Sequence, residues 1–149
     1  MQNKKAVKGP RLDNQLCFAI YGAAHAFNRA YKPLLEPLGL TYPQYLVMMV
    51  LWENDSQPVK AIGERLGLDS GTLSPLLKRL QQAGYVARER SSGDERQVII
   101  SLTDAGAALQ QRAADVMQSI GIATGCTREE IDSMREKLHA LRRQLAPEE

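Results

Sequence analysis

VKAIGERLGLDSGTLSPLLKRLQQAGYVARERSSGDERQVIISL, residues 59–102, is the stretch that determines the predicted fold. Its first part predicts a short helix, because Val59, Ile62 and Leu66 recur at the spacing of one helical face. Gly67 ends that helix, since glycine readily adopts the left-handed backbone that a helix C-terminus often needs. The chain then turns at once into a second short helix.

The second helix exposes side chains of the kind that read DNA. Asp69 or Ser70 can cap its first N–H groups, and a stripe of leucines predicts one buried face that continues to Gly84. The opposite face has small polar groups at its start, which can approach base edges, and cations farther along, which can meet phosphates. These residues are Ser70, Gly71, Thr72, Ser74, Lys78 and Arg79. Pro75, which lies past the first turn, predicts a kink or a tightened first turn.

Two strand-like runs follow, residues 86–90 and 97–102, joined by the turn SSGDE. A hairpin this short gains little stability alone, so we expect it to pack against the helices while its tip projects into solvent. An arginine on such a projection can enter the narrow, electronegative minor groove of DNA. A solvated charged hairpin is the alternative, but its place directly after the second helix favours DNA binding. The charged residues of this wing that we assign to DNA binding are Arg88, Arg90, Asp94 and Arg96.

Helices are predicted on both sides of the winged part, residues 41–102, within a single domain of residues 1–149. Residues 12–35, capped by Asp13, form the first of these helices, and residues 103–146 form the last two. The predicted class is therefore mainly α with a small β-hairpin: a winged helix-turn-helix with N- and C-terminal dimerisation helices.

The last helix indicates a homodimer. Its apolar residues step by three and four, as in a coiled-coil seam that needs a partner helix. They are Ile131, Met134, Leu138, Leu141 and Leu145. An amphipathic helix packed on its own chain is the alternative. A twofold dimer would place two recognition helices about 34 Å apart, matched to a pseudo-palindromic operator in double-stranded DNA.

The net charge of +2 indicates that DNA affinity comes from locally clustered cations rather than from the overall field. Four cations form a basic N-terminal arm, which is either a solubilising tail or a source of phosphate contacts. They are Lys4, Lys5, Lys8 and Arg11.

The longest apolar run, residues 45–52, is too short to span a bilayer, and no secretory signal is recognisable. We therefore expect a cytoplasmic protein with no membrane partner.

The two cysteines, Cys17 and Cys126, lie far apart in the sequence and suggest no zinc-ligand pair, so no metal or cofactor is predicted. Cys17 lies about one turn inside the first predicted helix, where partial positive charge favours the thiolate that attacks peroxides. Tyr21, Tyr31 and Tyr42 follow it, and phenol hydroxyls can stabilise a thiolate by hydrogen bonding. From the residues alone, however, a free cysteine is more often a small buried apolar side chain.

Two stretches of the sequence resemble a known family. R-x-x-S-x-x-D-x-R followed by S-L-T-x-x-G, at residues 88–96 and 101–106, resembles the wing and the following helix start of MarR-type transcriptional regulators. LDNQLCFAIYGAAHAFNRAYKPLLEPLGLTYPQYLVMMVLWE, residues 12–53, is similar to the organic hydroperoxide sensors of the OhrR type within that family. The resemblance implies a DNA-binding repressor that an organic hydroperoxide releases. It also implies that Cys17 is the sensor and that Tyr31 and Tyr42 match the tyrosines that accompany the reactive cysteine in that family.

By the same resemblance, Cys126 indicates the subtype in which a second cysteine closes a disulfide across the dimer. In the other subtype a small thiol caps the sulfenic acid. Cys126 lies in the glycine-flanked segment TGCT before the last helix, and an incidental exposed thiol remains the alternative. The implied chemistry runs from thiolate to sulfenic acid to disulfide, and the helix movement that this bond requires would lower operator affinity.

Three other functions fit parts of the sequence. A thiol peroxidase would use Cys17, but it needs an arginine near the thiol and Arg29 is twelve residues away, so we predict a sensor and not an enzyme. A MarR-type repressor could instead be released by a small aromatic ligand in the cleft between the dimerisation and DNA-binding parts, with Cys17 merely packed. A helical adaptor that does not bind DNA is the third.

Overall fold

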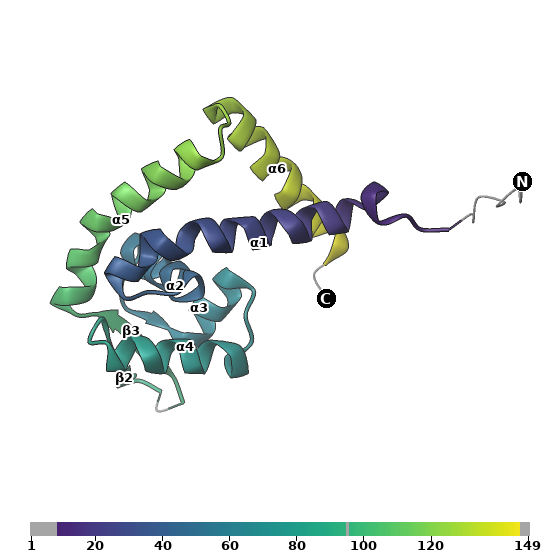
Figure 1. Cartoon of the computed structure of the whole chain (residues 1–149). Coiled ribbons are helices and arrows are strands. Elements are labelled where there is room, and N and C mark those ends of the chain that lie inside the picture. Colours follow the sequence, from purple (N-terminus) through teal and green to yellow (C-terminus); the bar gives the residue numbers. More distant parts are fainter. Residues whose placement is uncertain (1–8, 95, 147–149) are drawn as a thin grey trace, which may run out of the picture.

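The computed structural model describes residues 9–94 and 96–146, so Lys4, Lys5 and Lys8 of the basic arm lie outside the described residues. Figure 1 shows a mainly helical chain with one small sheet. The elements in chain order are the 3-10 turn η1 (Leu12–Asn14), α1 (Leu16–Leu35), the 3-10 turn η2 (Glu36–Leu38), α2 (Tyr42–Glu53), β1 (Gln57–Pro58), α3 (Val59–Leu66), α4 (Ser70–Gln82), β2 (Val86–Arg90), β3 (Val98–Leu102), α5 (Asp104–Ala123) and α6 (Arg128–Leu145).

Local side-chain chemistry places several helix ends where the sequence predicts them. Thr41 and Gln44 form a reciprocal capping box at the start of α2. Asp69 caps α4, because its carboxylate accepts the N–H of Thr72 at 2.7 Å. Gly67 ends α3 with a left-handed backbone, φ 68°. The last two of these features, Gly67 and the Asp69 cap, define the turn between α3 and α4.

The prediction that Asp13 caps the first helix is wrong. Asp13 lies within η1 and does not cap the first helix, because Gln15 N–H closes a local turn onto Leu12 C=O at 3.1 Å. The helix α1 begins only at Leu16, after the extended backbone of Gln15. The helix α4 is α-helical over its whole length, so of the two outcomes predicted at Pro75, a kink or a tightened first turn, the tightened turn does not form. Proline there removes only one backbone hydrogen bond, and the buried leucine face holds the helix.

The predicted hairpin is part of a three-stranded antiparallel sheet with the order β1-β3-β2. The strand β2 pairs with β3 from Val86 opposite Leu102 to Arg90 opposite Val98, while β1 pairs with the other edge of β3. Ile100, in the middle of β3, is fully buried. The wing is therefore anchored through its central strand to the helical core.

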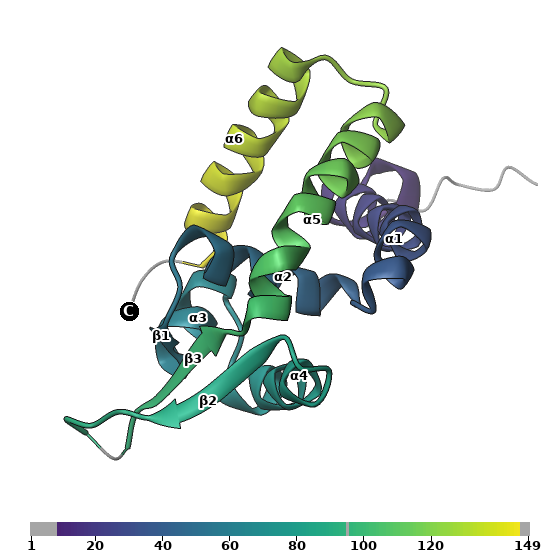
Figure 2. The same cartoon turned by 90° about the vertical axis from the view of Figure 1, so that its left-hand side faces the viewer.

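The core lies around α2, whose residues Val47, Met48 and Leu51 are fully buried. In Figure 1, α2, α3, α4 and the sheet form the winged part, and α5 leads away from it before α6 turns back. Figure 2 shows β2 and β3 extending as a wing beyond the helices. Within the described residues, no helix is both long and apolar enough to cross a membrane.

Three residues of the apolar seam of α6, Met134, Leu138 and Leu145, are exposed in the single chain. Met134 is 48% exposed and Leu145 is 75% exposed. On α1, Leu16 and Tyr21 are each 63% exposed. Residues of this size rarely remain so open over two neighbouring helices unless another surface covers them.

Candidate DNA-binding surface and thiol site

The helix α4 presents its predicted polar face to solvent. Leu73, Leu77 and Leu80 are buried against the core, which fixes the rotation of the helix about its axis. The opposite face is therefore free to meet a duplex. All of the side chains predicted to read DNA from this helix are exposed: Ser70, Gly71, Thr72, Ser74, Lys78 and Arg79.

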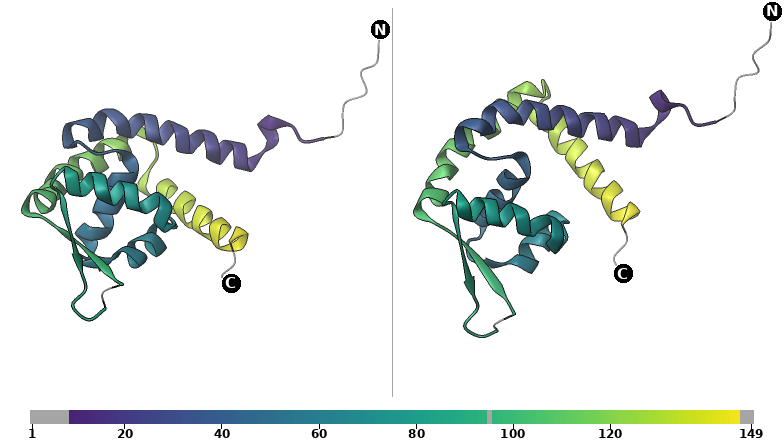
Figure 3. Two further views of the ribbon diagram at one scale, coloured as in Figure 1. Left: turned by 90° about the horizontal axis from the view of Figure 1, so that it is seen from below. Right: turned by 60° about the horizontal axis from the view of Figure 1, so that its bottom comes forward.

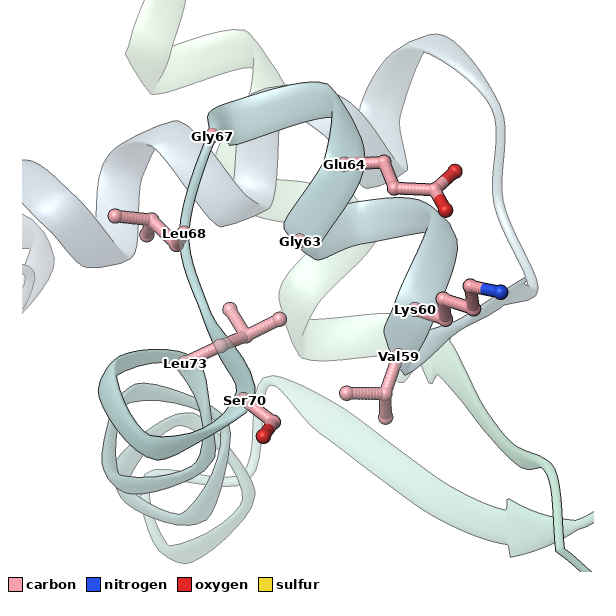
Figure 4. Close-up of a pocket in the computed structure, with 8 residues that line it drawn as sticks. All are labelled: Val59, Lys60, Gly63, Glu64, Gly67, Leu68, Ser70 and Leu73. Carbon is pink, nitrogen blue, oxygen red and sulfur yellow. The ribbon is translucent and has the colours of Figure 1, made fainter. Parts of the chain in front are cut away.

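A close approach of the backbone holds α3 and α4 together. A Cβ on Gly63 would lie 2.8 Å from the carbonyl oxygen of Leu68, closer than Cβ atoms come to backbone, so this position suits glycine. A hollow of about 480 Å³ lies between the two helices. Figure 4 shows Val59 and Lys60, at the start of α3, across this hollow from Ser70, at the start of α4. The N-terminal ends of both helices thus border the same hollow.

The turn between β2 and β3 is shaped by Asp94. Its carboxylate accepts the N–H of Arg96 at 3.0 Å, and its carbonyl accepts the N–H of Gln97 at 3.0 Å. These contacts form a local Asx-type turn that fixes the backbone at Arg96. Arg88, Arg90 and Arg96 are exposed, and Figure 3 shows the wing projecting from the body of the protein. The wing therefore carries three exposed arginines, and two hydrogen bonds to Asp94 hold the backbone of its turn.

Cys17 is the second residue of α1, and its side chain is an exposed free thiol. Cys17 therefore lies at the N-terminal end of the α1 dipole, where the first N–H groups of a helix carry partial positive charge. Tyr21 lies one turn farther along the same face, and its ring contacts His25 edge-on with centroids 4.4 Å apart. We did not predict a role for His25 from the sequence. Its position in the same helix as Cys17 was the only feature that linked the two residues.

Tyr31, Tyr42 and Tyr45 form an aromatic cluster at the far end of α1. The ring centroids of Tyr31 and Tyr42 are 4.6 Å apart, and those of Tyr31 and Tyr45 are 5.8 Å apart. Burial, with the neighbouring phenols as smaller causes, raises the pKa of Tyr31 to about 12, and burial also raises the pKa of Tyr42 and that of Tyr45. Tyr31 follows Cys17 by fourteen helical residues, or about 21 Å along α1. The structure therefore separates this cluster from the thiol of the same chain.

Cys126 lies in the turn between α5 and α6 and is partly buried. Its N–H donates to Thr124 Oγ1 at 3.2 Å, and its thiol donates to the Thr124 carbonyl at 3.4 Å. It lines an apolar pocket of about 310 Å³ together with residues of α1, α5 and α6, among them Phe27, Ile120 and Met134. Cys17 is not part of this lining, and the two cysteines are both free. A bond between them requires movement or a second chain.

The arrangement of helix, turn, helix and wing corresponds to a known family of proteins. A family model described as transcriptional regulator SarA/Rot matches residues 29–112, which include the whole winged part. An organic hydroperoxide resistance transcriptional regulator of Bacillus subtilis is 45% identical over 131 residues, covering 88% of this chain and 89% of that protein. The chain belongs to this family of MarR-type transcriptional regulators. The prediction of a DNA-binding winged helix-turn-helix is thereby confirmed.

Other members of this regulator family are similar over most of their length. The HTH-type transcriptional regulator TtmR of Methylorubrum extorquens is 54% identical over 136 residues, which cover 87% of this chain and 70% of TtmR. The reduced form of AbfR bound to DNA has a TM-score of 0.76 at 41% identity, covering 91% of this chain and 94% of that one. AbfR, from Staphylococcus epidermidis, is also known in a disulfide form, with a TM-score of 0.64 at 42% identity and coverage of 88% and 92%.

Proposed function

We propose that this regulator is a homodimeric repressor that senses organic hydroperoxides through Cys17 and then releases its operator. The observation that carries the proposal is the exposed thiol of Cys17 in the first turn of α1. The 45% identity to the organic hydroperoxide resistance regulator of Bacillus subtilis supports the choice of oxidant. A thiol oxidised once per release makes the protein a stoichiometric sensor and not an enzyme.

In this proposal, α4 enters the major groove and the wing reaches the adjacent minor groove. Exposed small polar residues at the start of α4 can approach base edges, while Lys78 and Arg79 contact phosphates. Arg88, Arg90 and Arg96 supply the minor-groove contacts, and Asp94 acts by holding the backbone of Arg96. The similarity to AbfR in its DNA-bound form supports this assignment.

A dimer would cover the apolar faces that the single chain leaves open. We assign α1, α5 and α6 to dimerisation, because Leu16, Met134 and Leu145 are exposed along α1 and α6. The tyrosines that we assign to thiolate support, Tyr21, Tyr31 and Tyr42, then come from two chains. Tyr21 lies on the helix of Cys17 itself, whereas the cluster of Tyr31 and Tyr42, about 21 Å along the helix, belongs to the other subunit.

The proposed chemistry balances with one hydroperoxide and two thiols. The Cys17 thiolate attacks the terminal peroxide oxygen, so that an S–O bond forms, the O–O bond breaks, and the alkoxide takes up a proton and leaves as an alcohol. The thiol of Cys126 from the partner then attacks the sulfenic sulfur, and water leaves as the disulfide forms. Because the two sulfurs must approach to about 2 Å, the helices that carry them must move.

The test is operator binding by the full chain before and after treatment with cumene hydroperoxide. Cys126→Ser should retain the first oxidation step but lose the cross-linked dimer band on non-reducing gels. Persistence of that band would show that another route forms the cross-link.

Tyr31→Phe and Tyr42→Phe should slow the oxidation of Cys17, and unchanged oxidation rates in both variants would remove the tyrosines from the mechanism.

A second candidate is a regulator released by a small aromatic ligand, and the apolar pocket of about 310 Å³ favours it. This pocket lies among α1, α5 and α6 rather than beside the winged part, where the sequence placed the ligand cleft. Ala26→Leu would fill the pocket from α1. Release of DNA by phenolic acids in wild type and Cys17→Ser, but not in Ala26→Leu, would favour this candidate over the sensor.

A further inference from the structure

Tyr85 connects three parts of the winged fold through its backbone. It lies between the end of α4 and the first residue of β2, and its N–H donates to the carbonyl of Leu80 at 3.0 Å. Its own carbonyl accepts the N–H of Thr103, just before α5, at 3.1 Å. A Cβ on Gly106 would lie 3.0 Å from the carbonyl carbon of Tyr85, so α5 starts directly against it. Tyr85 therefore cannot shift without displacing α4, the wing or α5.

The side chain of Tyr85 extends to η2, the turn that ends α1. Its hydroxyl donates to the carbonyl of Leu38 at 2.8 Å. Gly39, with φ 70°, lies beside the phenol, and a Cβ there would be 3.6 Å from the hydroxyl oxygen, an ordinary contact distance. Residues 47 positions apart in the sequence are thus joined by one hydrogen bond.

Arg112 of α5 holds the neighbouring carbonyl of the same turn. Its Nη2 donates to the carbonyl of Pro37 at 3.0 Å, across 75 residues of sequence. The carbonyls at a helix end have no partner within the helix, so they must be paired from elsewhere. Here two side chains from outside α1 pair them, and Figure 1 shows the passage from α1 to α2 lying next to α5.

We propose that Tyr85 and Arg112 are positioning residues that couple α1 to the DNA-binding surface through η2. The inference rests on the proposed function, in which oxidation of Cys17 displaces α1. Displacement of α1 moves η2, and the two hydrogen bonds pass this movement to the end of α4, to β2 and to α5. Coupling of this kind is reciprocal, so DNA binding in turn restrains η2.

The first test compares operator dissociation constants of the reduced and cumene hydroperoxide-treated protein. Tyr85→Phe removes only the hydroxyl, and it should lower the ratio of oxidised to reduced dissociation constants toward 1, by at least about twofold. A merely structural role would lower the unfolding midpoint, or weaken both affinities equally, and leave the ratio unchanged. An unchanged ratio overturns the proposal.

Arg112 is tested by a graded pair of variants with a charge-matched control. Arg112→Gln should reduce the same ratio, while Arg112→Lys keeps a cationic donor and should preserve more of it. Arg135→Gln removes one cation from α6, where Arg135 pairs with Asp132, and should leave the ratio unchanged. An equal effect of Arg112→Gln, Arg112→Lys and Arg135→Gln would overturn the role of the hydrogen bond.

Amide hydrogen exchange tests the coupling without any oxidant. In the reduced protein, operator DNA should slow exchange of the Gly39 and Leu40 amides, which donate to the carbonyls of Glu36 at 2.9 Å and Leu35 at 3.2 Å. Tyr85→Phe should reduce this slowing, because only the bond from Arg112 remains. Equal slowing in both proteins, or none in wild type, overturns the proposal. If hydroperoxide leaves the wild-type operator affinity unchanged, the sensing function fails instead, and the exchange result alone decides the coupling.

Discussion

Gly106, the last residue of the S-L-T-x-x-G motif, is the position where one added methyl group should do the most damage. It is the third residue of α5 and is buried against the backbone of Tyr85. A Cβ there would lie 3.0 Å from the carbonyl carbon and 3.3 Å from the Cα of Tyr85, and closer still to the carbonyl oxygen. Because these are backbone atoms between α4 and β2, no side chain can rotate away, and α5 must retreat.

The expected loss of stability for Gly106→Ala follows from three contributions. Overpacking of a rigid site typically destabilises by about 1–3 kcal/mol. Retreat of α5 also stretches the bond from Thr103 N–H to Tyr85 and that from Trp52 Nε1 to the Gly106 carbonyl, at 3.1 and 3.0 Å, each worth about 1 kcal/mol. Alanine regains about 1 kcal/mol of helix propensity over glycine. The net loss is about 2–4 kcal/mol.

Gly121→Ala provides the matched control in the same helix. A Cβ at Gly121 would meet nothing within 4 Å, so this change should be neutral or stabilise by up to about 1 kcal/mol. The assay is urea-induced unfolding of both variants and wild type at one protein concentration, since the stability of the proposed dimer would depend on concentration. Wild-type stability in Gly106→Ala, or an equal loss in Gly121→Ala, would refute the packing argument.

Three further predictions concern the wing, the tyrosine cluster and the cap of α4. Arg96→Ala should weaken operator binding by about tenfold with the dimer still folded, and an affinity unchanged at every salt concentration would contradict the wing's role. The pKa of Tyr31 is raised in the folded state from 10.0 to about 12, so stability should fall as pH rises through that interval. Tyr31→Phe should reduce this fall, whereas identical alkaline profiles of the unfolding midpoint would argue against it. The hydrogen bond from Thr72 lowers the pKa of Asp69 below 3.8, so the cap's stabilisation should disappear as pH falls through the folded value. Asp69→Asn should flatten the acid dependence of stability, and an unaltered dependence would exclude Asp69 as its cause.

Local chemistry made the winged part predictable from the sequence. Thr41 with Gln44 and Asp69 with Thr72 form caps between residues three positions apart, and Gly67 ends its helix through its own backbone freedom. Such signals need no knowledge of the remaining fold.

The sequence did not predict the structural features that depend on residues far apart in the chain. The strand β1 has only two residues, one of them Pro58, and exists because β3 pairs with it. Tyr85 and Arg112 bond carbonyls 47 and 75 residues away, which no local pattern indicates. The sequence grouped Tyr31 with Cys17, yet both lie on the one continuous helix α1, which holds them about 21 Å apart within a chain.

Operator affinity of wild type and Cys17→Ser, measured with and without cumene hydroperoxide at fixed salt, tests the central claim most directly. The account predicts that hydroperoxide weakens wild-type binding by at least about fivefold and leaves Cys17→Ser bound. Equal release of both proteins, or no release of the wild type, would contradict Cys17 as the sensor.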